Sequence, residues 1–114
     1  MIIQYQTLII VAIAIMLDVI TGVSQAAYNN CLSSSKMRNG VYHKLSYVFA
    51  IALAGLIEYA SAYIELGFDL PLVIPVVVYI VLTEVISIFE NICLINPELK
   101  SSPLFKLLAH KDHE

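Results

Sequence analysis

The chain has 114 residues, of which 60% are apolar and 13% are charged, and its formal net charge is −3. An ordinary soluble domain is about 45–50% apolar and about 25% charged, and a small protein exposes much of its surface to water. The composition therefore excludes a disordered chain, a nucleic-acid-binding protein and an ordinary soluble globule. It indicates a membrane protein of one domain, residues 1–114.

Three long apolar segments account for the excess, and they predict helices over about 5–27, 45–64 and 71–95. An 18-residue helix is about 27 Å long, which approaches the ~30 Å hydrocarbon thickness of a bilayer. A lone segment in lipid must satisfy its own backbone hydrogen bonds, so each segment is expected to be helical. The fold class expected is an all-α integral membrane protein with three transmembrane helices. A re-entrant or interfacial first segment is the alternative.

The ends of these segments carry further signals. Asp69 is expected to cap the helix over 71–95, with Pro71 in its first turn. A cleaved signal peptide ending near residues 24–27 is a weaker alternative. No Lys or Arg precedes the first apolar segment, and Asp18 interrupts it, whereas a secretory signal has a basic start and a shorter apolar region.

The basic residues predict the orientation. Three lie in the expected loop 28–44 and three in the expected tail 96–114, namely Lys36, Arg38, Lys44, Lys100, Lys106 and Lys111. The connection over 65–70 contains none. Basic residues favour the cytoplasmic side, so the expected topology places the N-terminus outside and the C-terminus inside. Lys36, Arg38 and Lys44 are expected to anchor a cytoplasmic loop to lipid phosphates, and the tail is expected to form a short amphipathic segment.

Four acidic residues lie within the expected spans, and no Lys or Arg does. An ionised acid at mid-bilayer costs roughly 2.5–3.5 kcal/mol on insertion scales, so these side chains are expected to face protein or water. Spacings of three and four place small or polar side chains on one face of each helix. The candidate hole-lining or helix-contact residues on these faces are Asp18, Thr21, Gly22, Gln25, Glu58, Ser61, Glu84, Ser87, Glu90 and Asn91. Two other roles stay open: holding together a compact bundle, and relaying protons or cations.

The sequence shows no motif typical of a catalytic, metal-binding or nucleotide-binding site. Cys31 and Cys93 form no CxxC motif and have no nearby set of metal ligands, so both are expected to be structural thiols. The chain contains no nucleophile elbow, metal triad or nucleotide-binding loop. We therefore expect no enzyme activity, no catalytic residue, no metal, no cofactor and no nucleic-acid partner.

Three motifs, in order along the chain, resemble the toxin-secretion/phage-lysis holin family. Residues 17–22 resemble its D-x-x-T-G signature, 33–44 its S-S-x-K…G…K segment, and 84–91 its E-x-x-S-I-x-E-N motif on the last helix. Pro97 and Leu99 fit the short P-x-L continuation of the family. The sequence departs at Thr83, where the family often has Asn, and at Glu58, where it often has Asp. His43 and Lys44 stand where it has a basic pair.

The resemblance implies a holin that oligomerises in the cytoplasmic membrane of a phage-infected bacterium and forms lesions. Its partners would be further copies of itself, membrane lipid, an endolysin or an exported toxin, and an antiholin in some systems. Two alternatives remain. One is a small multimeric transporter that uses Asp18 or Glu84 as a coupling acid, and the other is an antiholin-like structural membrane subunit.

Overall fold

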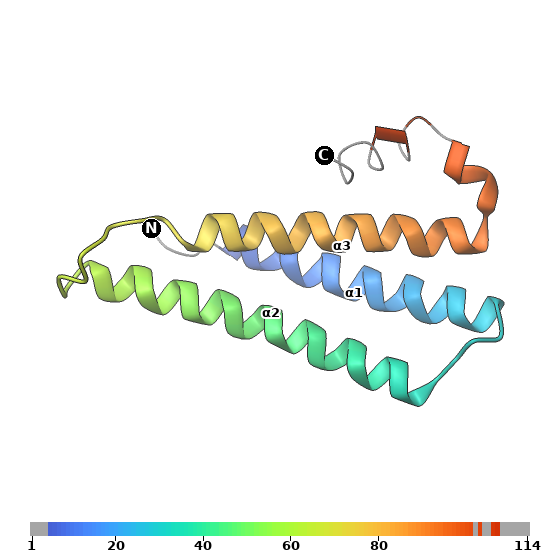
Figure 1. The fold of residues 1–114 in the computed structure, drawn as a ribbon, viewed down its shortest axis with the longest axis horizontal. Helices are drawn as coiled ribbons and strands as arrows, with labels where there is room; N and C mark the ends of the chain where they lie inside the picture. The colour runs from blue at the N-terminus through green and yellow to red at the C-terminus, as the bar shows by residue number, and fades with distance from the viewer. Residues whose placement is uncertain (1–4, 102, 104–105, 108–114) are drawn as a thin grey trace.

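The computed structural model describes residues 5–101, 103, 106 and 107, and over these residues it contains helices and no strand. Three long helices follow one another: α1 (Tyr5–Tyr28), α2 (Ser34–Ser61) and α3 (Val73–Ile95). A short 3₁₀ helix, η1 (Pro97–Ser101), comes after α3. Figure 1 shows the three long helices side by side, with α2 running in the opposite direction to α1 and α3. The bundle thus has an α1–α2 end and an α2–α3 end, named after the connections there.

Each long helix is long and apolar enough to cross a membrane. The helices contain 24, 28 and 23 residues, which correspond to about 36, 42 and 35 Å, against ~30 Å for the hydrocarbon core. α1 is a single unbroken helix, which does not match the re-entrant alternative for the first segment. The structure supports an all-helical protein with three candidate spans. The amphipathic segment expected in the tail falls mostly on residues that the structure does not describe.

α2 begins much earlier than the sequence indicated. Residues 34–44 were expected to be part of a loop, but they form the first three turns of this helix. Ser33 has an extended backbone, and its hydroxyl accepts a hydrogen bond from the Lys36 backbone N–H at 3.3 Å, which satisfies one free donor of the first turn. The connection from α1 is correspondingly short, and Asn30 turns it with a positive φ of 56°. Lys36, Arg38 and Lys44 therefore lie on α2.

The start of α3 also differs from the expectation. Leu72 occupies the N-cap position without a side-chain cap, so the predicted Asp69 cap is wrong. Instead, the Glu58 carboxylate, from α2, accepts a hydrogen bond from the Val73 backbone N–H. Pro75 is tolerated because first-turn N–H groups have no partner within the helix. Glu58 thus joins α2 to α3 at the α2–α3 end.

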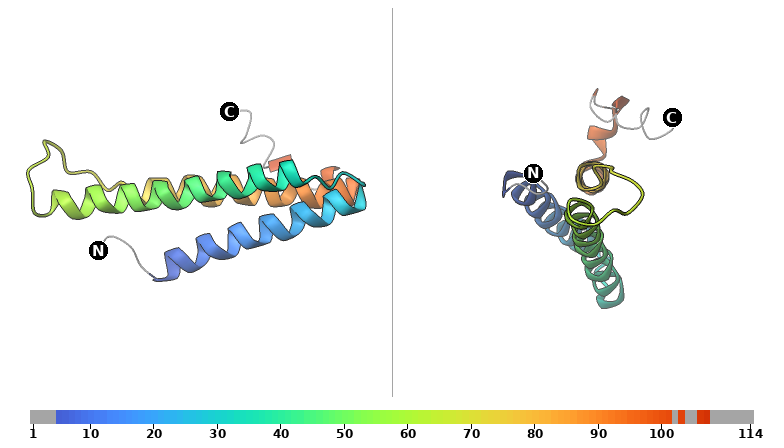
Figure 2. Two further views of the ribbon diagram at one scale, coloured as in Figure 1. Left: turned by 90° about the horizontal axis from the view of Figure 1, so that it is seen from below. Right: turned by 90° about the vertical axis from the view of Figure 1, so that its left-hand side faces the viewer.

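The apolar core lies in the half of the bundle nearer the α2–α3 end. Its buried residues come from all three helices and are Val11, Tyr47, Ile51, Ala54, Val73, Val77 and Ile80. α1 and α3 pack extensively against each other, and α2 packs mainly against α3. Toward its N-terminal end α2 diverges from α3 (Figures 1 and 2), and all of residues 34–46 except Lys44 are exposed.

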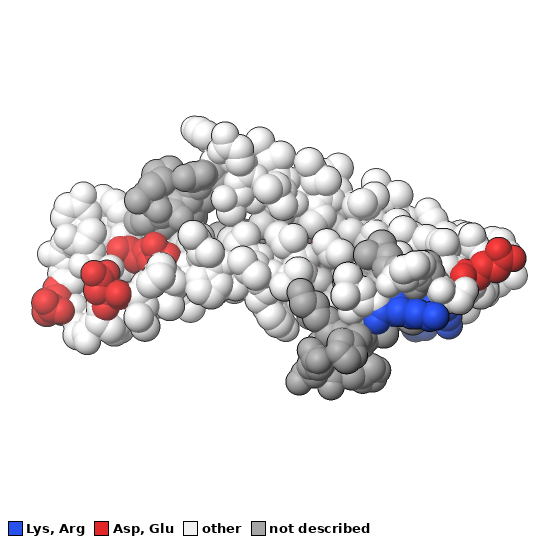
Figure 3. Space-filling model, turned by 90° about the horizontal axis from the view of Figure 1, so that it is seen from above, with Lys and Arg blue, Asp and Glu red and all other residues white. Residues whose placement is uncertain are grey.

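The outer surface is largely apolar. Large side chains such as Ile9, Ile13, Phe49 and Leu53 are more than half exposed. On the face drawn in Figure 3, the charged residues that are coloured lie toward the two ends of the molecule. This distribution matches a helical bundle whose middle contacts lipid and whose ends reach water.

We expect the Glu58→Ala substitution to destabilise the packing of α2 against α3. A buried backbone N–H that loses a charged acceptor costs roughly 1–3 kcal/mol. The measurement is thermal unfolding in detergent micelles, together with hydrogen exchange at the Val73 amide, which should accelerate. Asp69→Ala is the matched control and should change neither quantity. Equal effects of the two substitutions would contradict the assignment of Glu58 as the cap.

Candidate functional site

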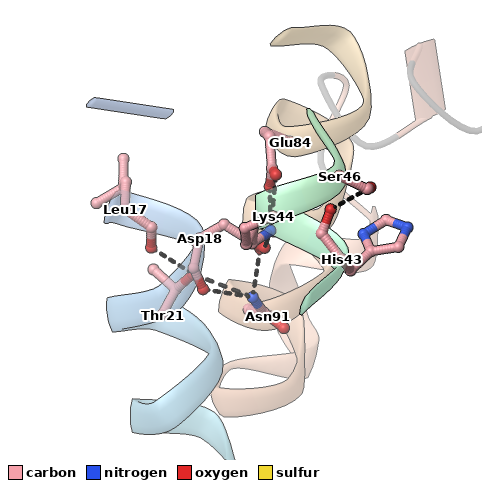
Figure 4. Close-up of polar contacts among 8 residues, drawn as sticks. All are labelled: Leu17, Asp18, Thr21, His43, Lys44, Ser46, Glu84 and Asn91. Atoms are coloured by element: carbon pink, nitrogen blue, oxygen red, sulfur yellow. Dashed lines mark hydrogen bonds and ion pairs between the residues drawn. The ribbon is translucent and has the colours of Figure 1, made fainter. Parts of the chain in front are cut away.

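Three charged residues lie at one depth in the bundle. Asp18 is ten residues before the end of α1, Lys44 is ten residues after the start of α2, and Glu84 is eleven residues before the end of α3. Because α2 runs opposite to its neighbours, these positions are all about 15–17 Å from the α1–α2 end. Figure 4 shows their side chains converging between the helices.

Lys44 is bonded to both acids. Its Nζ donates a hydrogen bond to Asp18 Oδ2, and it lies 2.7 Å from each carboxylate oxygen of Glu84. Glu84 is 1% exposed and Asp18 is 9% exposed, while the Lys44 side chain is 17% exposed. Two carboxylates therefore share one ammonium group, and the cluster has a formal net charge of −1.

Asn91 extends this network on α3. Its Nδ2 lies 3.1 Å from Asp18 Oδ1 and 3.1 Å from Thr21 Oγ1, and it can donate to either oxygen. The Thr21 hydroxyl in turn donates to the Leu17 carbonyl oxygen at 2.8 Å. Asp18 is thus held from two sides, by Lys44 and by Asn91. We call Asp18, Thr21, Lys44, Glu84 and Asn91 the charged cluster.

The cluster is internally satisfied. Among the described residues, no buried side-chain nitrogen or oxygen lacks a hydrogen-bond partner. The Tyr47 ring lies on the core side, with its centroid 5.9 Å from Lys44 Nζ. In surroundings of low dielectric such pairing is strong, and an acid deprived of its cation is correspondingly costly. The cluster therefore fixes how the three helices face each other.

No Lys or Arg was expected within the spans, but Lys44 lies inside α2 and is bonded to two of the acids. Lys44 was assigned to the loop because it precedes the second apolar segment, which begins at Leu45. Once α2 begins at Ser34, Lys44 lies nearly three turns inside the helix, at the depth of Asp18 and Glu84. Matching the depth of opposite charges on antiparallel helices is the signal that would have found it.

The remaining candidate residues are distributed around the cluster or away from it. Gly22 packs against it, since a Cβ at this position would lie 3.5 Å from Asn91 Nδ2. Gln25 and Ser87 line a cavity beside it. Ser61 lies with Glu58 near the α2–α3 end, where its hydroxyl donates to the Glu58 carbonyl oxygen at 2.8 Å. Glu90 is exposed on α3. Their role as hole-lining residues stays a prediction.

The cavity has a volume of about 610 Å³ and opens between the C-terminal part of α1 and the N-terminal part of α2. Lys36 lines it, whereas Arg38 is exposed on α2 outside it. Within the described part of the chain, no group of three His, Cys, Asp or Glu side chains is placed to hold a metal ion. Cys31 is an exposed free thiol and Cys93 a buried one.

Comparison with known proteins identifies a family for this chain. The family model described as "Bacteriophage holin family" matches residues 3–109, which is nearly the whole chain and includes every residue of the charged cluster. The chain has no significant match among curated proteins or among solved structures.

We expect the Lys44→Met substitution to destabilise the bundle strongly. Removing the shared cation leaves two buried carboxylates facing each other, and breaking a buried pair on one side costs roughly 3–5 kcal/mol. Thermal unfolding in detergent micelles measures the effect, and Lys36→Met is the matched control, with little change expected.

Neutralising the acids as well, in Lys44→Met/Asp18→Asn/Glu84→Gln, should recover most of the lost stability. A triple variant as unstable as Lys44→Met would show that the charge balance does not explain the loss.

Proposed function

Because the chain belongs to the bacteriophage holin family, we propose that it oligomerises in the cytoplasmic membrane of an infected bacterium and forms lesions there. The lesions release an endolysin, and host lysis follows. Lesions of the same kind can instead export a toxin. Three helices long enough to cross a membrane support this proposal. The partners are further copies of the chain, membrane lipid, the endolysin and, in some systems, an antiholin.

The charged cluster provides the mechanism, and it is the observation that carries the proposal. While the protein is dilute, each protomer hides Asp18 and Glu84 against Lys44, so these two acids do not face lipid. An unpaired acid facing lipid would be unfavourable by a few kcal/mol. The folded protomer can therefore accumulate without permeabilising the membrane.

The weak attachment of one half of α2 supports the opening step. Of residues 34–46, only Lys44 is not exposed, so this part of α2 is held mainly by its contacts with Asp18 and Glu84. Above a critical density, α2 separates from the other helices, and the polar faces of α1 and α3 meet those of neighbouring protomers. Water then replaces the lost pairing, and the faces line the lesion.

The charge distribution supports an orientation with the N-terminus outside. Lys36 and Arg38 lie near the α1–α2 end, whereas Glu65 and Asp69 lie in the connection at the α2–α3 end. Among the coloured residues of the face drawn in Figure 3, the basic ones lie toward one end. The positive-inside rule then places the α1–α2 end in the cytoplasm.

The transporter alternative has less support. A coupling acid must take up and release a proton or cation during transport. Asp18 and Glu84 both accept hydrogen bonds from Lys44, which favours a structural pairing over a free coupling site. An experiment can distinguish an antiholin from a holin, because an antiholin delays lysis and a holin causes it.

The direct test is inducible expression in a bacterium that contains a potential-sensitive dye and a cytoplasmic reporter enzyme. We expect abrupt depolarisation after a delay. Depolarisation with release of the reporter indicates large lesions, and depolarisation alone indicates small ones. Slow growth with neither event would contradict the holin proposal. If the chain delays the lysis that a co-expressed holin causes, it acts as an antiholin.

We expect Asp18→Leu and Glu84→Leu to change the time of lysis or abolish it, because each removes one acid of the polar faces and leaves Lys44 with a single partner. The measurement is the time from induction to depolarisation at equal membrane levels of protein. Glu65→Leu, in an exposed connection, is the matched control. If both variants insert into the membrane normally and depolarise it at the wild-type time, the polar-face mechanism is contradicted.

A further inference from the structure

The cavity between α1 and α2 is not explained by the charged cluster. It exists because α2 diverges from its neighbours toward the α1–α2 end, so that about 610 Å³ opens between the two helices. Gly40 lies on its wall, and a Cβ built there would have no heavy atom within 4 Å. Nothing in the described part of the chain fills this space.

The lining of the cavity includes both polar and apolar side chains. At the α1–α2 end it presents the donors of Lys36 and Asn39, on successive turns of α2. Apolar side chains also line the walls, among them Val19 and Val23 from α1 with Met37 and Val41 from α2. The charged cluster forms the far end.

The acids that line the cavity do not compete for Lys36. Asp18 and Glu84 are the acidic residues in the lining, and both are bonded to Lys44. Lys36 lies eight residues from Lys44 along α2, about 12 Å closer to the end of the helix. It forms no ion pair with the described residues, so its ammonium group is free to bind an anion.

This arrangement fits one class of ligand. α2 is about 42 Å long against a ~30 Å hydrocarbon core, so a membrane-spanning α2 would bring Lys36, in its first turn, near the lipid phosphates. A basic residue near the membrane surface attracts an anionic headgroup. The apolar walls match an acyl chain. A soluble anion would leave these walls uncovered. A second copy of a mostly apolar helix would leave Lys36 without an anionic partner.

We propose that the cavity binds an anionic phospholipid of the surrounding leaflet, with its phosphate on Lys36 and Asn39 and its acyl chain between Val19, Val23, Met37 and Val41. The site depends on the protein being in a membrane and is independent of lesion formation. The bound lipid fills the space beside α2 and keeps water from the charged cluster in the protomer before it opens.

The test is native mass spectrometry of the protein after extraction from vesicles of phosphatidylglycerol and phosphatidylcholine. We expect a retained phosphatidylglycerol on the wild type. Lys36→Gln removes the charge-assisted contact and should weaken retention about tenfold. Lys100→Gln, a basic residue of η1 outside the cavity lining, is the matched control and should retain the lipid.

Gly40→Leu tests the cavity itself. Leucine has a higher helix propensity than glycine, and its side chain enters open space, so the helices should stay folded. The lipid should be lost while helicity and unfolding temperature are maintained. A Val48→Leu substitution, at an exposed position farther along α2, should leave the lipid in place.

Three results would overturn the proposal. The first is equal lipid retention in the wild type, Lys36→Gln and Gly40→Leu. The second is displacement of the lipid by millimolar inorganic phosphate, which would make the site one for a free anion. The third is a lipid-free wild-type dimer that Gly40→Leu dissociates, which would make a second copy the occupant. Since all these readouts use purified protein, they are independent of the lysis assay that tests the proposed function.

Discussion

One ammonium group between two carboxylates is the interaction on which the arrangement of this bundle depends. Asp18 and Glu84 lie on different helices, and burying both without a cation would place two like charges together in a medium of low dielectric. Lys44 removes that conflict only if α2 is placed so that its Nζ reaches both acids at once. The register of α2 against α1 and α3 follows from this requirement, and Asn91 on α3 holds Asp18 from the other side.

The two halves of α2 are held by different forces. Near the α2–α3 end it contributes Tyr47, Ile51 and Ala54 to the apolar core, and Glu58 caps α3. Near the α1–α2 end Lys44 is its main attachment, and a cavity separates it from α1. An apolar contact in a membrane has no hydrophobic driving force against lipid, so polar pairing decides which helix faces stay together. The bundle is therefore firmly packed at the α2–α3 end and held mainly by Lys44 at the other, in a family whose members permeabilise membranes.

Much of the fold was accessible from the sequence. Apolar length predicted three helices and their approximate positions, because a chain in lipid must form its backbone hydrogen bonds locally. The motifs around Asp18 and Glu84 led to the holin family, and the family model confirms that assignment. Two helix starts were predicted incorrectly. α2 begins at Ser34 and not near residue 45, and α3 is capped by Glu58 and not by Asp69. The α3 error came from judging a helix start by nearby residues when Glu58 on another helix caps it. The α2 error came from placing the start at the apolar segment when Ser33 caps the helix well before it.

The sequence by itself determined that the chain is helical and spans a membrane, since hydropathy and hydrogen bonding act within each segment. It also identified Asp18 and Glu84 as polar groups that must be shielded from lipid. Only the tertiary structure identified what shields them. Lys44 is 26 residues from Asp18 and 40 from Glu84 along the chain. Such a pairing has no local signature, because it depends on the depth and direction of three helices at once.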